Sequence, residues 1–290
     1  MEKSSDEQRV SVVVDSSTCI EPALAQKLGI TMVPLHLCLD GRDLRDLQDV
    51  RPAEVYRALR EGAVITTSSA SVGDYLQAFQ HASGQVFCLT VASSMTSMHD
   101  AATMAARLAE DAEVRIVDTG TAAGGLRLIA LDAARMAKAG LSLDEIEARA
   151  RTISERIEMI GMLDTVEYLA RSGRIPQVAA WGSSALKVRP VVRFAEGRGS
   201  LVTLVRGNGW ARRELLKLVK EGARRRSAGE AGKGLVCTVF HADAPGLAGD
   251  LQARLREKLP EADISLSEFT PAMGVHTGPG LVGYALYVEP

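Results

Sequence analysis

The stretch VSVVVDSST, residues 10–18, sets the pattern for the first half of the chain. Its β-branched run is typical of a buried strand, and the polar turn that follows is suited to begin a helix. The pattern recurs at residues 86–94 and 114–120, where apolar runs end in Ala-Ser-Ser and Asp-Thr-Gly. Strands that alternate with helices in this way predict a parallel sheet with helices on both faces. Ligands of such sheets bind beyond the carboxyl ends of the strands, where these polar turns fall.

Helices are expected around these strands at residues 21–28, 52–61, 97–109, 126–138 and 143–159. The second half of the chain is richer in extended segments. Apolar runs at 191–194, 201–205, 235–241, 264–269 and 282–288 predict strands, with helices over 210–225 and 246–259. This mixture is typical of an α+β domain with a largely antiparallel sheet.

A chain of 290 residues is long enough for two domains. The predicted fold class is therefore α/β, with a Rossmann-like domain over residues 1–160 and an α+β domain over 161–290. A ligand is expected between the two domains.

Composition excludes several classes of protein. A net charge of −2 and an aromatic content of 4% argue against a nucleic-acid-binding surface. The four cysteines have no CxxC spacing, and the five histidines are not spaced as metal ligands, so no metal site is expected. The first nine residues are polar, and no apolar run approaches the length of a membrane span. These features predict a cytoplasmic protein without an integral membrane segment.

The near-zero net charge conceals an uneven distribution. Residues 171–226 hold 14 Lys and Arg side chains against three Glu, whereas residues 40–61 are rich in acidic side chains. The basic stretch is either a docking face for an acidic protein partner or an ordinary solvated surface. The sequence favours neither alternative.

Two clusters of hydroxyl side chains follow predicted strands or precede predicted helices. Residues 66–71, TTSSAS, hold five hydroxyls, and residues 93–97, SSMTS, repeat the theme. Hydroxyls and helix-N-terminal amides together form a neutral site for a carboxylate or a phosphate. Helix capping is an equal alternative for residues 66–71, and it is favoured for the Asp15-Ser16-Ser17-Thr18 turn. If the clusters bind an anion, both could converge on the same one.

Two further strings hold side chains suited to an anion. Arg174 follows Gly173 in a turn after a predicted helix, where it either caps that helix or clamps an anion. The string His276-Thr277-Gly278-Pro279-Gly280 predicts a rigid turn that fixes a histidine able to handle a proton or a phosphate. No Gly-x-Ser-x-Gly motif supports a serine nucleophile, so no catalytic residue is expected.

Six strings occur in an order that resembles the DegV family. They are residues 14–18 (VDSST), Thr67-Ser68-x-x-Ser71, Ser93-Ser94-x-Thr96, Val117-Asp118-Thr119, Tyr168-Leu-x-x-x-Gly173-Arg174-Ile175 and His276-Thr277-Gly278-Pro279-Gly280. The resemblance covers residues 10–290. It implies a two-domain bacterial protein that binds a fatty acid and has no cofactor. Some members of this family are the acyl-carrying subunit of a fatty acid kinase, and they present the fatty acid to a separate ATP-binding subunit that makes acyl phosphate.

The resemblance also implies roles for individual residues. Thr67 and Thr96, with their neighbours Ser68 and Ser97, would hold the carboxylate of the fatty acid. The chain departs from the family pattern here, because TSSAS replaces the usual Thr-Ser-Gln-Pro-Ser and MTSMH replaces Leu-Ser-Gly-Thr-Tyr. Ser97 thus stands where the family has a glycine.

Three more residues would form a network at the mouth of the pocket, namely Arg174, His276 and Asp46. The implied partners are a fatty acid of about 14–18 carbons, such as palmitate, and a kinase subunit. Aliphatic side chains suffice to line an acyl tunnel, and a buried carboxylate requires hydrogen-bond donors, which the hydroxyls supply. The alternative is an enzyme that acts on a small carboxylated or phosphorylated metabolite at the hydroxyl clusters.

Overall fold

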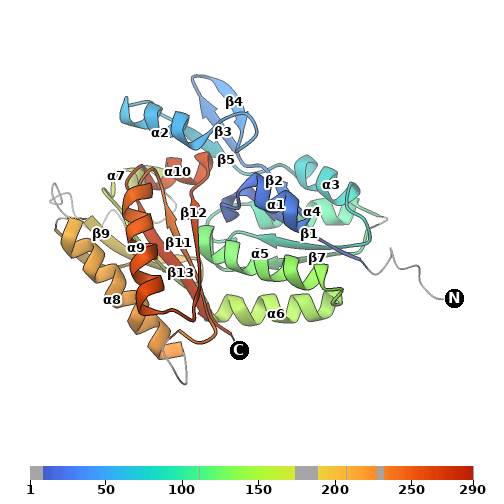
Figure 1. Ribbon diagram of the computed structural model, residues 1–290. Helices are drawn as coiled ribbons and strands as arrows, with labels where there is room; N and C mark the ends of the chain where they lie inside the picture. Colours follow the sequence, from blue (N-terminus) through green and yellow to red (C-terminus); the bar gives the residue numbers. More distant parts are fainter. Residues whose placement is uncertain (1–8, 111, 174–188, 207, 227–231, 290) are drawn as a thin grey trace.

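The computed structural model describes residues 9–110, 112–173, 189–206, 208–226 and 232–289 (Figure 1). These residues form a four-stranded sheet of order β2-β1-β6-β7, a six-stranded sheet of order β10-β9-β8-β13-β11-β12 and a three-stranded sheet of order β4-β3-β5. No helix within these ranges combines the length and the apolar character needed to cross a membrane.

The four-stranded sheet is parallel throughout, as predicted. It consists of β1 (Val10–Asp15), β2 (Ile30–Val33), β6 (Gln85–Thr90) and β7 (Val114–Asp118). Helices α1 (Pro22–Leu28), α5 (Ala123–Lys138) and α6 (Leu143–Arg156) cover one face, and α3 (Val72–Gln80) and α4 (Met98–Leu108) cover the other (Figure 1). Both faces are therefore buried, which explains the almost continuous valine run of β1.

The six-stranded sheet is largely antiparallel, also as predicted. Its strands are β8 (Glu158–Met162), β9 (Arg189–Ala195), β10 (Arg198–Val205), β11 (Leu235–His241), β12 (Asp263–Glu268) and β13 (Val282–Val288). Only β11 and β12 run parallel among these pairs, and α9 (Pro245–Lys258) connects them. Helix α9 packs with α8 (Asn208–Arg226) on one face of this sheet, and α5 contacts β8, β11 and β13 from the other domain.

The three-stranded sheet was not predicted from the sequence. It contains β3 (His36–Leu39), β4 (Arg42–Arg45) and β5 (Thr66–Ser68), and α2 (Pro52–Arg60) follows β4 along the chain. Helix α10 (Pro271–Thr277) contacts α2, β3, β5 and α7 (Glu167–Ser172). This small sheet is thereby tied to the C-terminal part of the molecule.

Several elements differ from those expected from the sequence. The helix expected over residues 143–159 ends at Arg156, because Ile157 adopts an extended conformation (φ −61°, ψ 131°) and leads into β8. Strand β8 therefore spans the predicted domain boundary between residues 160 and 161. Residues 66–68, expected only as part of a polar connection, pair with β3 as a strand.

Two glycines expected to precede α5 instead lie in its first turn. A methyl group on Gly124 would come within 2.7 Å of the Phe240 ring, and one on Gly125 would collide with the hydroxyl of Thr121. A side chain at either position would force Phe240 or Thr121 to shift, so glycine fits the close packing of α5.

Candidate functional site

A cavity lies between the four-stranded and six-stranded sheets. It encloses about 980 Å³ of space free of protein atoms, including the part open to solvent. The cavity lies at the carboxyl ends of β1 and β6, where the sequence pattern predicts a ligand.

The lining of this cavity is mainly apolar. Its apolar members are Leu35, Val91, Met95, Met98, Ala122, Ala123, Met159, Gly161, Leu163, Leu169, Val192, Phe194, Phe240, Phe269, Met273 and Leu281. Its polar members are Ser17, Thr67, Ser69, Thr96, His276 and Thr277. Within the described part of the chain, no Asp, Glu, Lys or Arg side chain lines it.

The two hydroxyl clusters meet at the wall of this cavity. The Oγ of Ser69 lies 2.7 Å from the Oγ1 of Thr96, and the Ser97 hydroxyl donates to the Ser69 Oγ at 3.3 Å. Thr67 and Ser69 both line the cavity, whereas the side chain of Ser68 is exposed and is not part of the lining. Strand alternation explains this difference, because Thr67 and Ser69 lie two residues apart and share a face.

Helix capping and cavity lining are divided among different hydroxyls of residues 66–71. Ser71 caps α3, since its hydroxyl accepts from the Asp74 amide at 3.1 Å and the Asp74 carboxylate accepts from the Ser71 amide at 2.7 Å. Thr67 and Ser69 line the cavity instead. Capping thus occurs at Ser71, and the anion site predicted for this segment stays a prediction for Thr67 and Ser69.

His276 also lines the cavity, but it does not begin a turn as predicted. It lies in the last turn of α10, and the tight turn starts at Gly278 (φ 72°), where a side chain would collide with the ring of Tyr168. The Nε2 of His276 is hydrogen-bonded to the Oγ1 of Thr67 at 2.9 Å. This contact joins the three-stranded sheet to α10 at the cavity wall.

Asp46 is buried behind the cavity and does not line it. Its carboxylate accepts from the Ser16 hydroxyl at 2.6 Å and from the Ala272 amide at 2.9 Å, so it connects the turn after β1 with the start of α10. Burial raises the pKa of Asp46 to about 6. An ion pair of Arg45 and Asp49 closes the turn around it, with 2.9 Å between Nε and Oδ2, and the bonds from Arg45 lower the pKa of Asp49 to about 2.

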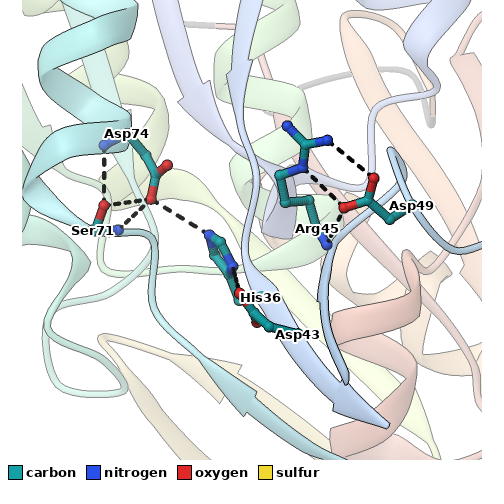
Figure 2. Close-up of polar contacts among 6 residues, drawn as sticks. All are labelled: His36, Asp43, Arg45, Asp49, Ser71 and Asp74. Carbon is teal, nitrogen blue, oxygen red and sulfur yellow. Dashed lines mark hydrogen bonds and ion pairs between the residues drawn. The ribbon is translucent and has the colours of Figure 1, made fainter. Parts of the chain in front are cut away.

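The sheet that carries Thr67 is joined to α3 by a histidine between two carboxylates (Figure 2). The Nδ1 of His36 lies 3.0 Å from the Oδ2 of Asp43, and its Nε2 lies 3.5 Å from the Oδ2 of Asp74. Burial raises the pKa of Asp74, but hydrogen bonds from Ser71 and the charge of His36 outweigh it, so the pKa is lowered. His36 pairs with Ser68 in the ladder of β3 and β5, and this anchor therefore holds β5 in place.

Of the residues predicted for the pocket mouth, Arg174 lies outside the described residues. Residues that sequence reasoning did not select are Ser17, Ser69, Thr277 and Phe240. Ser69 could have been found from the alternation of a strand, but only if residues 66–68 had been identified as one. The described residues contain no group of three or more His, Cys, Asp or Glu side chains placed to hold a metal ion.

Comparison with known proteins agrees with the resemblance seen in the sequence. Residues 9–289 match a family model described as "Uncharacterised protein, DegV family". A DegV domain-containing protein of Streptomyces coelicolor is 33% identical over 281 residues, which cover 95% of this chain and 97% of that protein.

Two solved structures are similar over nearly the whole chain. A DegV family protein from Thermus thermophilus, described as binding fatty acid, has a TM-score of 0.88 at 27% identity, covering 97% of this chain and all of the other. A Thermotoga maritima protein, described as having a fatty-acid-binding function, has a TM-score of 0.83 at 26% identity, again covering 97% of this chain and all of the other. On this extent of sequence and structural agreement, the chain belongs to the DegV family.

Proposed function

We propose that this protein binds a long-chain fatty acid in the cavity between its two larger sheets. The observation that carries the proposal is the cavity lining, which is apolar over most of its residues and bears uncharged hydroxyl and imidazole groups over the rest. The fatty acids bound by the related proteins of Thermus thermophilus and Thermotoga maritima support it. At about 0.8 kcal/mol per buried methylene, an acyl chain of about 16 carbons contributes on the order of 10 kcal/mol.

The carboxylate of the fatty acid binds at the hydroxyls of Thr67 and Thr96. Ser97 donates to Ser69, and the contact between Ser69 and Thr96 allows either hydroxyl to donate; with Ser69 as donor, the Thr96 proton remains for the ligand. Hydrogen bonds in such a chain strengthen one another. Thr67, held by His276, supplies a second contact. Arg174 completes the mouth of the pocket in this proposal, and Asp46 supports it from behind the cavity through Ser16 and the start of α10.

The protein carries the fatty acid in the cytoplasm and presents it to an ATP-binding kinase subunit. There a carboxylate oxygen attacks the γ-phosphorus of ATP, the bond to ADP breaks, and acyl phosphate forms. Neutral donors suit this role, because an ion pair with arginine would hold the oxygen more tightly and reduce its nucleophilicity. The protein itself performs no catalysis and needs no cofactor or metal.

The ligand is tested on the protein as purified. Denaturation, extraction and mass spectrometry should recover close to one fatty acid of about 14–18 carbons, palmitate among them, per chain. Recovery of a small polar metabolite, or of nothing after incubation with these fatty acids, would contradict the proposal. The enzyme alternative requires turnover of such a metabolite, which the mainly apolar lining disfavours.

The kinase partner is tested separately, with purified kinase subunit and ATP. Acyl phosphate should form only when both proteins are present. Arg213 and Arg224, exposed on α8 within the basic stretch, are replaced by glutamate, and Arg107→Glu on α4 serves as the control. A docking role predicts that only the α8 variant slows acyl phosphate formation, and equal rates would leave the basic stretch as a solvated surface.

A further inference from the structure

One aromatic side chain of the cavity wall lies in a recess made by three glycines. Phe240 of β11 pairs with Gly283 of β13, which pairs with Gly161 of β8, which pairs with Val192 of β9. Residues paired across neighbouring strands point to the same face of a sheet. This row therefore presents a phenyl ring, two positions without side chains and a valine toward the cavity.

The Phe240 ring extends over the glycines of this row. A methyl group on Gly283 would come within 2.5 Å of its Cε2, and one on Gly161 would lie 3.7 Å from the same atom. On the opposite edge, a methyl group on Gly124 of α5 would lie 2.7 Å from Cδ1. The ring is thus enclosed by β13, β8 and α5.

Phe269 fixes the remaining side of the ring. The two aromatic rings stack with centroids 5.2 Å apart and planes inclined by 29°. Phe269 is held in turn, because its carbonyl oxygen accepts from the Tyr56 hydroxyl at 3.2 Å and its amide donates to the His241 carbonyl at 2.7 Å. Phe240 is only 2% exposed and has little freedom to move aside for a ligand.

The ring also lies at the other end of α10 from His276. Phe269 directly precedes the N-cap of α10, whereas His276 lies in its last turn. At 1.5 Å per helical residue, Pro271 and His276 are about 8 Å apart along this helix. Phe240, stacked on Phe269, therefore lines the cavity near the N-terminal end of α10.

We infer that Phe240 is the residue that limits the size of the acyl chain. This inference rests on the proposed function and adds its specificity determinant. The ring occupies space that three glycines leave empty, and that space would join the cavity if the ring were smaller. Conversely, a methyl group on Gly161 would narrow the cavity, and its nearest neighbour, Leu281 Cδ1 at 3.1 Å, is the end of a flexible side chain that can shift.

The test is a competition among saturated fatty acids of 14 to 20 carbons, supplied in equal amounts to delipidated protein and measured by mass spectrometry. Phe240→Ala should raise the ratio of bound C20 to bound C16 acid about tenfold. This is the gain in affinity expected if the enlarged cavity buries two more methylene groups of the longer acid. Gly161→Ala should lower the same ratio. Phe87→Leu, at a buried phenylalanine that does not line the cavity, should leave it unchanged.

Phe240→Leu is measured alongside Phe240→Ala, because removing the whole ring in the alanine variant can prevent folding. Circular dichroism and urea unfolding identify the folded variants. If wild-type protein binds no fatty acid, the proposed function fails. If wild-type protein binds fatty acid and the ratio stays constant in folded Phe240→Leu and Gly161→Ala, the size limit lies elsewhere and the inference is overturned while the proposed function stands.

Discussion

Asp46 is an acidic side chain whose pKa of about 6 makes stability depend on pH. A carboxyl whose pKa is raised on folding stabilises the folded state at low pH, and this contribution is lost as pH rises from about 4 to 6. Asp46→Asn removes the titration, so the variant should gain about 2 kcal/mol relative to wild type between pH 4 and pH 7. Urea unfolding at intervals of half a pH unit measures this difference. A constant difference would contradict the assignment of the shift to Asp46.

Thr67 and Ser68 are adjacent hydroxyls that the structure places differently. Thr67 lines the cavity and contacts His276, whereas Ser68 is exposed. Because a hydrogen bond to a charged group contributes about 1.5–3 kcal/mol, Thr67→Val should weaken fatty-acid binding by roughly 10- to 150-fold. Ser68→Ala should change affinity less than about twofold. Titration of delipidated protein with palmitate measures both, and equal losses would contradict the assignment of the carboxylate to Thr67.

The sequence indicates the chemistry of these residues better than their geometry. The segments around Thr67 and Thr96 stood out in the sequence because they hold more hydroxyl side chains than helix caps require. Both residues line the cavity. Whether Ser68 or Ser69 lines the cavity depends on which face of β5 Ser68 occupies, since Ser69 follows directly after the strand. That face is fixed by pairing with β3, which lies about 30 residues earlier in the chain, so local sequence does not reveal it.

Helix α3 supports the three-stranded sheet through its first turn. Asp74 completes the capping box with Ser71 and contacts His36 of β3, whereas Asp43 contacts His36 from the exposed side. Asp74→Ala removes the cap and one contact of His36, so it should lower the free energy of unfolding by about 1–2 kcal/mol. Asp43→Ala should cost less than about 0.5 kcal/mol, because exposed ion pairs contribute little. Urea unfolding compares the two variants, and an equal cost would mean that the capping box contributes nothing.

The elements that the sequence missed are those specified by tertiary contacts. Helix α10 contains Gly274, which disfavours a helix locally, yet a methyl group there would lie 2.5 Å from the Tyr56 ring of α2. Strand β8 follows α6 almost directly, and only the extended Ile157 separates them. By contrast, β1, β6 and β7 were predicted because each combines an apolar run with a polar turn.

A cavity between two sheets couples ligand binding to the stability of the whole molecule. The lining draws Met98 and Ala123 from the parallel domain and Met159 and Phe194 from the other sheet. At a free palmitate concentration 100 times the Kd, the free energy of unfolding should rise by about 2.7 kcal/mol. Hydrogen exchange should slow in β6 and β9 alike. Protection confined to one sheet would indicate a ligand that does not bridge them.

The position of β13 has a consequence for biosynthesis. This strand, the last along the chain, lies between β8 and β11 in the middle of the six-stranded sheet, and its Gly283 lies beneath the Phe240 ring. On the ribosome, the parallel domain can begin to fold once β7 has emerged, whereas β8 waits for a neighbour made more than 100 residues later. Until β13 has left the exit tunnel, the edges of β8 and β11 that pair with it remain open to chaperones. The wall of the cavity formed by the six-stranded sheet is therefore complete only after residue 288 has been made.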